Sequence, residues 1–153
     1  MDEKIGKNAP DFIIQDQKGK NFRLSDFKGK KVLLSFHPLA WTAVCAKQMQ
    51  SLEEHKDRFE ELNTVAVGIS VDSVPCKEAW AKSLEIKDTR LLADFWPHGE
   101  VAGKYGILRE KNGFSERANI IVDETGKIIF FKVYEIRTLP DINEIIDFLK
   151  GDS

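Results

Sequence analysis

The chain has 153 residues, of which 42% are hydrophobic and 31% are charged. A chain of this length and composition is expected to fold as one globular domain over residues 1–153, which excludes a disordered protein and makes disulfide staples unnecessary. The 23 basic and 25 acidic residues are interspersed and nearly cancel to a formal charge of −2, so the sequence has neither a basic tract for nucleic acid nor an acidic tail.

The first part of the chain has the pattern of a hairpin followed by a strand–helix–strand unit. Residues 12–24 alternate loosely between apolar and polar side chains, which predicts the hairpin. Residues 32–36 are an apolar run typical of a buried strand that ends before Pro38. A helix is expected from about Thr42, and β-branched residues 64–71 predict the next strand. The apolar face of that helix comprises Cys45, Met49, Leu52, Phe59 and Leu62. Two strands joined in this way are parallel, with a right-handed crossover.

The rest of the chain predicts a helix, a short strand, a short helix, a β-hairpin and a final helix. Their expected ranges are 73–84, 91–93, 100–105, 118–134 and 140–149. Ser73 can cap the first helix, Pro75 fits its first turn, and Gly106 ends the second helix. This order is that of an α/β protein with a thioredoxin-like fold: a central mixed β-sheet flanked by helices, with an N-terminal hairpin and a mid-chain insertion.

Cys45 is the candidate reactive residue. It lies in the first turn of a predicted helix, just beyond the carboxyl end of a buried parallel strand, where α/β proteins bind ligands. The unpaired N–H groups and the positive end of the helix dipole favour a thiolate at this position. Thr42 stands three residues earlier, where a thioredoxin-type reductase has a second cysteine. No dithiol can therefore close across the start of this helix.

Other cofactor chemistry has little support in the sequence. Two cysteines are too few for a zinc site, and neither His37 nor His98 has further ligands at metal spacing. No glycine-rich phosphate loop is present. We therefore expect no metal and no cofactor, and we interpret His37 as a residue that flanks the site.

Pro38, Thr42 and Cys45 reproduce the Pro-x-x-x-Thr-x-x-Cys active-site motif of the peroxiredoxins, and the sequence resembles a full-length member of that family. Three further segments are similar to the family's N-terminal segment, second core strand and arginine-bearing strand: Ala9–Phe12, Val65–Asp72 and Arg117–Asp123. The segment Asp94-Phe95-Trp96-Pro97-His98-Gly99 is most similar to the one-cysteine alkyl hydroperoxide reductase E group. The resemblance implies a thiol-dependent peroxidase that reduces hydrogen peroxide, organic hydroperoxides or both.

The resemblance also implies a role for each motif residue. Cys45 is the peroxidatic cysteine, whose thiolate attacks one peroxide oxygen, expels water or an alcohol and becomes a sulfenic acid. Thr42 and Arg117 hold the peroxide oxygens and stabilise the charge that moves onto the leaving oxygen. Pro38 shapes the pocket and limits access of solvent. One departure concerns Gln48, where many members have a glutamate, because glutamine can bond Arg117 but cannot pair with its charge.

The role of Cys76 stays open between two alternatives. Some peroxiredoxins resolve the sulfenic acid from the helix after the second core strand, and Cys76 lies in that region. Against this, Cys76 shares a helix face with Trp80 and Leu84, as an inert core thiol would. The alternatives for the whole protein are a thiol–disulfide oxidoreductase, which Thr42 disfavours, and a non-catalytic thioredoxin-fold interaction module.

Partners and location follow from composition and resemblance together. No aliphatic run approaches the ~20 residues of a membrane span. Met1–Lys4 also lacks the basic and apolar blocks of a signal peptide. We therefore expect a cytoplasmic protein that binds neither membranes nor nucleic acid. The resemblance implies a homodimer, a peroxide substrate and a thiol reductant, which is either a thioredoxin- or glutaredoxin-like protein or a low-molecular-weight thiol.

Overall fold

The computed structural model describes residues 2–152. Within them, a seven-stranded sheet has the order β2-β1-β5-β4-β3-β8-β9. The strands are β1 (Ile13–Gln15), β2 (Asn21–Arg23), β3 (Lys31–Phe36), β4 (Thr64–Ser70), β5 (Arg90–Ala93), β8 (Arg117–Val122) and β9 (Ile128–Tyr134). The central strands β3, β4 and β5 are parallel, and the outer strands pair antiparallel. The expected mixed sheet is confirmed.

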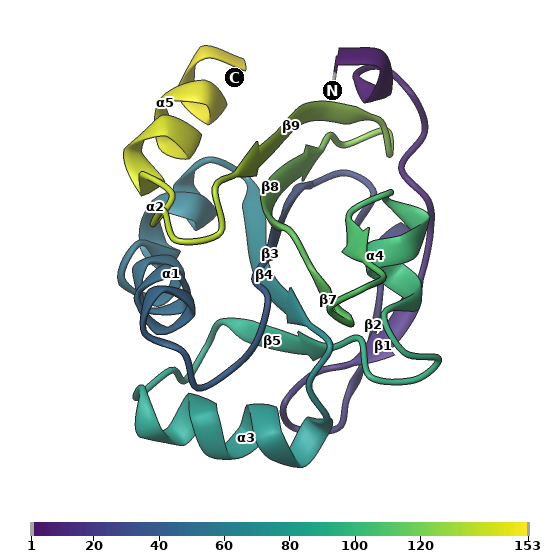
Figure 1. Cartoon of the computed structure of the whole chain (residues 1–153). Coiled ribbons are helices and arrows are strands. Elements are labelled where there is room, and N and C mark those ends of the chain that lie inside the picture. The colour runs from purple at the N-terminus through teal and green to yellow at the C-terminus, as the bar shows by residue number, and fades with distance from the viewer. Residues whose placement is uncertain (1, 153) are drawn as a thin grey trace.

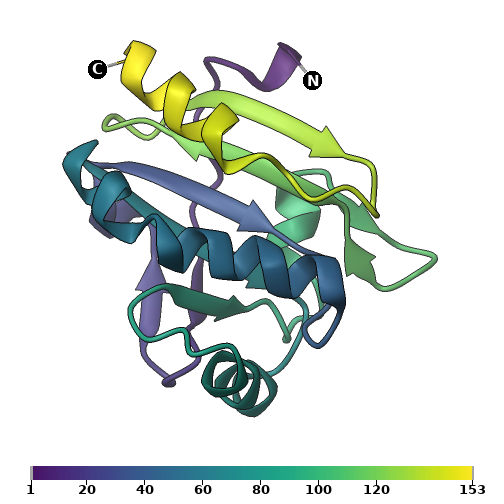
Figure 2. The same cartoon turned by 90° about the vertical axis from the view of Figure 1, so that its left-hand side faces the viewer.

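Helices cover both faces of this sheet (Figure 1). They are α1 (Ala43–Glu54), α2 (Lys56–Glu61), α3 (Val74–Ser83), α4 (Glu100–Lys104) and α5 (Ile142–Asp152). Two 3-10 turns, η1 (Asp2–Lys4) and η2 (Leu24–Phe27), and a small ribbon of β6 (Leu108–Arg109) and β7 (Phe114–Ser115) complete the described elements. In Figure 2, α1 lies across the front of the sheet between α5 and α3. Among residues 2–152, no helix combines the length and apolar character needed to cross a membrane.

The long helix expected from Thr42 through Leu62 is instead two helices that meet at His55. The His55 backbone leaves the helical region, with φ −105° and ψ 15°. Its ring Nδ1 lies 2.8 Å from the carbonyl oxygen of Ser51, which also accepts the His55 backbone N–H. The expectation of one helix was wrong. The apolar residues keep their helical spacing on both sides of the bend, so their spacing does not show that the helix is interrupted.

Alternation along β3 places its side chains in two separate cores. Val32, Leu34 and Phe36 belong to the core beneath α4, whereas Leu33 belongs to the core beneath α1, α3 and α5. Since both faces are covered, every residue of β3 is buried. Ser35, on the α1 face, is a buried polar residue near the end of this strand, which begins with the buried Lys31. The partners of Ser35 are found in the candidate site.

A glycine sets how closely α1 approaches the sheet. Gly68 in β4 is buried, and a Cβ built there would overlap the sulfur of Met49 on α1. The absence of a side chain therefore lets α1 pack directly on β4, which positions the first turn of α1 at the carboxyl ends of the parallel strands.

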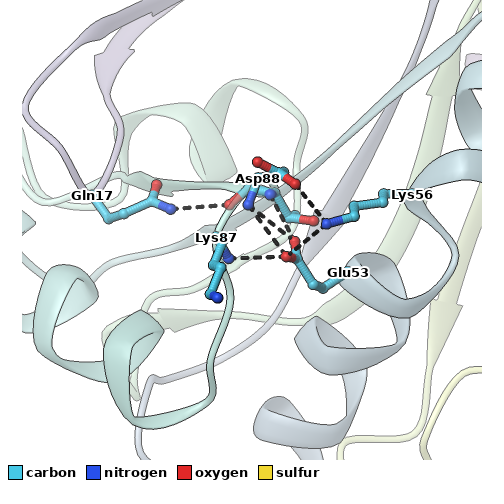
Figure 3. Close-up of polar contacts among 6 residues, drawn as sticks. Gln17, Glu53, Lys56, Lys87 and Asp88 are labelled. Atoms are coloured by element: carbon cyan, nitrogen blue, oxygen red, sulfur yellow. Dashed lines mark hydrogen bonds and ion pairs between the residues drawn. The ribbon is translucent and has the colours of Figure 1, made fainter.

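Glu53 fastens the last turn of α1 to the loop before β5 (Figure 3). Its carboxylate accepts backbone N–H groups of Lys87 at 2.9 Å, Asp88 at 3.3 Å and Thr89 at 2.9 Å, and Lys56 Nζ lies 3.4 Å away. Partial burial acts to raise the pKa of Glu53, but these backbone donors outweigh it and lower the pKa to about 2. The ionised carboxylate therefore stabilises the fold.

We expect Glu53→Gln to lower the free energy of unfolding at neutral pH by about 1–3 kcal/mol, because glutamine removes charge-assisted bonds to three backbone donors. The folded-state pKa lies below the unfolded value, so the contribution is fully present above the ordinary pKa of 4.5 and is lost as the pH falls toward about 2. Urea unfolding of both proteins across this range measures the difference. Glu54→Gln, at the neighbouring exposed position, is the control. Equal stability of Glu53→Gln and the parent at neutral pH would contradict this role.

Candidate active site around Cys45

The register of the sheet brings Arg117 to Cys45. In the antiparallel pair of β3 and β8, Ser35 lies opposite Asn119. Arg117 is two residues earlier in β8, so its side chain is on the same face as Asn119 and beyond the carboxyl end of β3. Cys45 begins α1 at that same end. Arg117 Nη1 lies 3.3 Å from Cys45 Sγ, across 72 positions of sequence, and both side chains are buried.

Arg117 is held in place by two further acceptors. Nη1 donates to Gln48 Oε1 at 2.7 Å, and Nε donates to the carbonyl oxygen of Ile136 at 2.9 Å. Gln48 Nε2 in turn donates to the Ser35 hydroxyl at 2.7 Å and to the Phe36 carbonyl at 3.2 Å. A carbonyl only accepts and a guanidinium only donates, so these contacts determine which way the Gln48 amide faces. Gln48 thus orients Arg117 without adding a negative charge, which leaves the full charge of the guanidinium facing the sulfur.

A chain of hydrogen bonds extends from this arginine toward α5. The Ser35 hydroxyl donates to Asn119 Oδ1 at 2.8 Å, and Asn119 Nδ2 lies 3.4 Å from Tyr134 Oη. Tyr134 Oη donates to a Glu144 carboxylate oxygen at 2.5 Å. These supporting residues are not among those predicted from the sequence. The available signal was a polar side chain between two apolar neighbours inside each of two predicted strands, at Ser35 and at Asn119.

Thr42 occupies the backbone N-cap position of α1, but its side chain caps no N–H group. Its hydroxyl instead donates to the carbonyl oxygen of Leu39 at 2.9 Å. The first N–H groups of α1, close to Cys45, therefore keep their donor capacity for an anion. Pro38 and Thr42 lie in the loop between β3 and α1. Pro38 is buried, and Thr42 is exposed.

The loop between Pro38 and Thr42 contains a strained residue. Trp41 has φ 68°, in the left-handed region that a side chain with a Cβ rarely adopts. The preceding residue is tied down, because the Ala40 N–H donates to Asp72 Oδ2 at 2.8 Å. Such a conformation persists only where its surroundings hold it, and this loop is fixed from both sides.

Cys76 is a half-buried free thiol in the first turn of α3. Its Sγ donates to Asp72 Oδ1 at 3.7 Å. Partial burial raises the pKa of the Cys76 thiol, and the Asp72 carboxylate raises it further. Cys76 is therefore held in the protonated form, which is a poor nucleophile.

The two histidines considered in the sequence, His37 and His98, lie in different surroundings. Among the described residues, no group of three or more His, Cys, Asp or Glu side chains is arranged to hold a metal ion. His98 Nε2 lies 2.6 Å from the carbonyl oxygen of Gly113 and is a loop contact. His37 is fully buried beside the site. The arrangement therefore presents one thiol, a facing guanidinium and a helix N-terminus, which together suit the attack of a thiolate on a polar substrate.

Comparison with known proteins agrees with this chemistry. The model of the AhpC/TSA family matches residues 5–131. Alkyl hydroperoxide reductase E of Mycobacterium tuberculosis is 39% identical over 127 residues, which are 82% of this chain and 82% of that protein. Peroxiredoxin-1 of Gekko japonicus is 34% identical, with 96% of this chain and 78% of that protein covered.

Solved structures show the same architecture. The reduced 2-Cys peroxiredoxin of Plasmodium vivax superposes with a TM-score of 0.88 at 28% identity, covering 97% of this chain and 81% of that one. The peroxidoxin BcpB of Mycobacterium tuberculosis superposes with a TM-score of 0.86 at 26% identity and covers 98% of each chain.

Proposed function

Since this chain belongs to the AhpC/TSA family of peroxiredoxins and is a thiol-dependent peroxidase, we propose that Cys45 is its peroxidatic residue. The observation that supports this assignment most directly is the 3.3 Å contact between Arg117 Nη1 and Cys45 Sγ at the start of α1. Cys76, the other thiol, faces a carboxylate instead. Nothing in the comparisons or the site favours a thiol–disulfide oxidoreductase or a non-catalytic module.

The proposed reaction needs no acid–base residue besides the sulfur itself. The Cys45 thiolate attacks one oxygen of the peroxide, the O–O bond breaks, and the electron pair leaves on the second oxygen. That oxygen takes up a proton from solvent water and departs as water or an alcohol, while the attacked oxygen stays on Cys45 with its hydrogen as a sulfenic acid. Arg117 stabilises the negative charge as it moves from sulfur to oxygen. The Thr42 hydroxyl, whose own proton is donated to the Leu39 carbonyl, accepts the O–H of the peroxide. Pro38 closes the inner wall of the pocket.

Peroxide is the oxidising substrate and a thiol is the reductant, and we propose that the thiol is external. The support is the Asp72 contact that keeps Cys76 protonated. One external thiol would condense with the sulfenic acid to give a mixed disulfide and water. A second thiol would release Cys45 as a disulfide forms between the two reductant sulfurs. The reductant is a thioredoxin- or glutaredoxin-like protein or a low-molecular-weight thiol.

We further propose a homodimer. Three aromatic side chains are exposed near the carboxyl ends of the parallel strands: Trp41 after β3, and Phe95 and Trp96 after β5. Trp96 is 79% exposed. Large apolar groups at one edge of a sheet are typical of a protein interface. Sedimentation of the protein at micromolar concentration measures the oligomeric state.

The peroxidatic assignment is tested by the intact mass of the reduced protein after one equivalent of hydrogen peroxide. We expect a gain of one oxygen atom per chain, and peptide mapping should locate it on Cys45. Oxidation that leaves Cys45 a free thiol would contradict the assignment.

The same treated sample tests the proposal for Cys76. We expect Cys76 to remain a free thiol, and Cys76→Ser to be oxidised at Cys45 at the parental rate, because the Asp72-bound thiol takes no part in the first step. A Cys45–Cys76 disulfide in the peptide map, with sulfinic acid accumulating only in Cys76→Ser, would show instead that Cys76 resolves the sulfenic acid.

A further inference from the structure

A second ionisable side chain is buried beside the site and has no part in the reaction described so far. Lys77 on α3 is fully buried. Its Nζ lies 2.7 Å from His37 Nε2 and 2.5 Å from Ser70 Oγ, and 5.3 Å from the centroid of the Trp80 ring. Lysine is among the residues least often fully buried, because removing an ammonium from water is costly unless its donors are satisfied.

The partners of Lys77 are arranged to accept its protons. His37 Nδ1 lies 3.4 Å from the Ser35 carbonyl oxygen, which can only accept, so Nδ1 carries the proton and Nε2 is the acceptor. The Ser70 hydroxyl donates to Asp72 Oδ2 at 2.6 Å, so its oxygen accepts from Lys77. The Trp80 ring is within cation–π distance. This environment suits an ammonium.

The same contacts connect Lys77 to both ends of the segment 37–40, which contains Pro38 and leads to Thr42. At one end, Lys77 bonds the His37 ring, while the His37 backbone N–H donates to the Ile69 carbonyl at 3.0 Å. At the other end, Asp72 Oδ2 accepts both the Ser70 hydroxyl and the Ala40 N–H. A change at Lys77 would therefore be transmitted to the loop in front of Cys45.

We propose that Lys77 is a positioning residue for the peroxidase reaction: its ammonium holds the 37–40 segment through His37, Ser70 and Asp72, and it adds a buried positive charge that favours the Cys45 thiolate. This inference rests on the proposed peroxidatic role of Cys45. It differs from the role of Arg117, because Lys77 acts from behind the loop, through its contacts with His37 and Ser70, whereas Arg117 contacts the sulfur itself.

The charge of Lys77 depends on pH in the neutral range. Burial lowers the pKa of Lys77 to about 7, against the opposing effect of the Asp72 carboxylate and, after it, of the Cys45 and Cys76 sulfurs. These groups face it from the end of β4, from α1 and from its own helix. Burial also holds the pKa of His37 well below its ordinary value, with further lowering by Lys77 and Arg117, so His37 stays neutral. The lysine is therefore the group of this pair that titrates.

This behaviour predicts a bell-shaped pH profile for the oxidation of Cys45. Attack on peroxide requires a thiolate, which for any thiol gives a rate that rises with pH. The ammonium of Lys77, in contrast, is lost as the pH rises through about 7. Because Cys45 and Lys77 interact, the apparent pKa values of the rising and falling limbs describe the two groups together and not either residue alone. A site without a titrating lysine would show only the rising limb of the thiolate.

The experiment measures the second-order rate of Cys45 oxidation by hydrogen peroxide, followed by tryptophan fluorescence in a stopped-flow instrument, from about pH 5 to 9. The parent protein is expected to show both limbs. Lys77→Met should lose the falling limb and be about tenfold slower near pH 6, as expected for the loss of one buried charge. Lys77→Arg keeps the positive charge at every pH. Its oxidation rate should therefore equal the parental rate near pH 6 and should not fall above pH 8. Lys82→Met, at an exposed position of the same helix, should match the parent.

Three results would overturn the inference. The first is a parental profile without a falling limb, which needs no variant and so decides the question even if Lys77→Met does not fold. The second is a folded Lys77→Met that keeps the falling limb and a rate within about twofold of the parent. In both cases Cys45 oxidation persists, so its peroxidatic role stands. The third is failure of the parent to be oxidised at Cys45, which would overturn the proposed function together with this inference.

Discussion

Replacing Cys45 with serine should reduce peroxide turnover to below about one-thousandth of the parental rate. A serine hydroxyl is not ionised near neutral pH and has no sulfur to be oxidised to a sulfenic acid, so neither the nucleophile nor the intermediate can form. The substitution changes one atom in a fully buried site, and the loss of stability should stay within about 1–2 kcal/mol.

The measurement is peroxide consumption in the presence of excess dithiothreitol, with thermal unfolding recorded on the same sample. Cys76→Ser is the matched control, since it also replaces one thiol in the first turn of a helix and is expected to keep its activity. Substantial turnover by folded Cys45→Ser, or loss of turnover in Cys76→Ser alone, would contradict the assignment of Cys45.

Arg117→Met should slow the oxidation of Cys45 roughly a hundredfold, which corresponds to about 2–4 kcal/mol of barrier. The guanidinium is 3.3 Å from the sulfur and is oriented by the amide of Gln48. Methionine fills much of the same volume but removes the positive charge and both donors. Arg117→Lys keeps the charge without the planar fork, so an intermediate rate is expected for it.

Rapid-mixing oxidation rates at a single neutral pH give this comparison directly. Removing Arg117 leaves the oxygens of Gln48 and Ile136 without this donor, which can cost about 1–3 kcal/mol of stability. The rates should therefore be measured well below the unfolding temperature of each variant. Arg137→Met, an exposed arginine in the same part of the chain, controls for a change in net charge. Agreement of Arg117→Met with the parent within about threefold would place this arginine outside the reaction.

Whatever depends on neighbours along the chain was determined by the sequence. Three predicted features are local: the strand at residues 32–36, the helix start near Thr42 and the cap at Ser73. Each depends only on residues within a few positions, through an apolar run, a proline or an N-cap side chain. Ser73 does accept the N–H of Cys76, at 3.4 Å. The spacing of Pro38, Thr42 and Cys45 is local too, which is why a short motif was enough to locate the candidate nucleophile.

Only the tertiary structure decided what surrounds that nucleophile. The contact between Arg117 and Cys45 follows from the register of β3 against β8, which no residue near either position encodes. A lysine in a predicted helix is expected to be exposed to solvent, yet Lys77 is fully buried. Its partners come from the ends of two parallel strands. Charge and burial at a site depend on which elements pack together. The local pattern of residues does not show which distant elements will be neighbours in the fold.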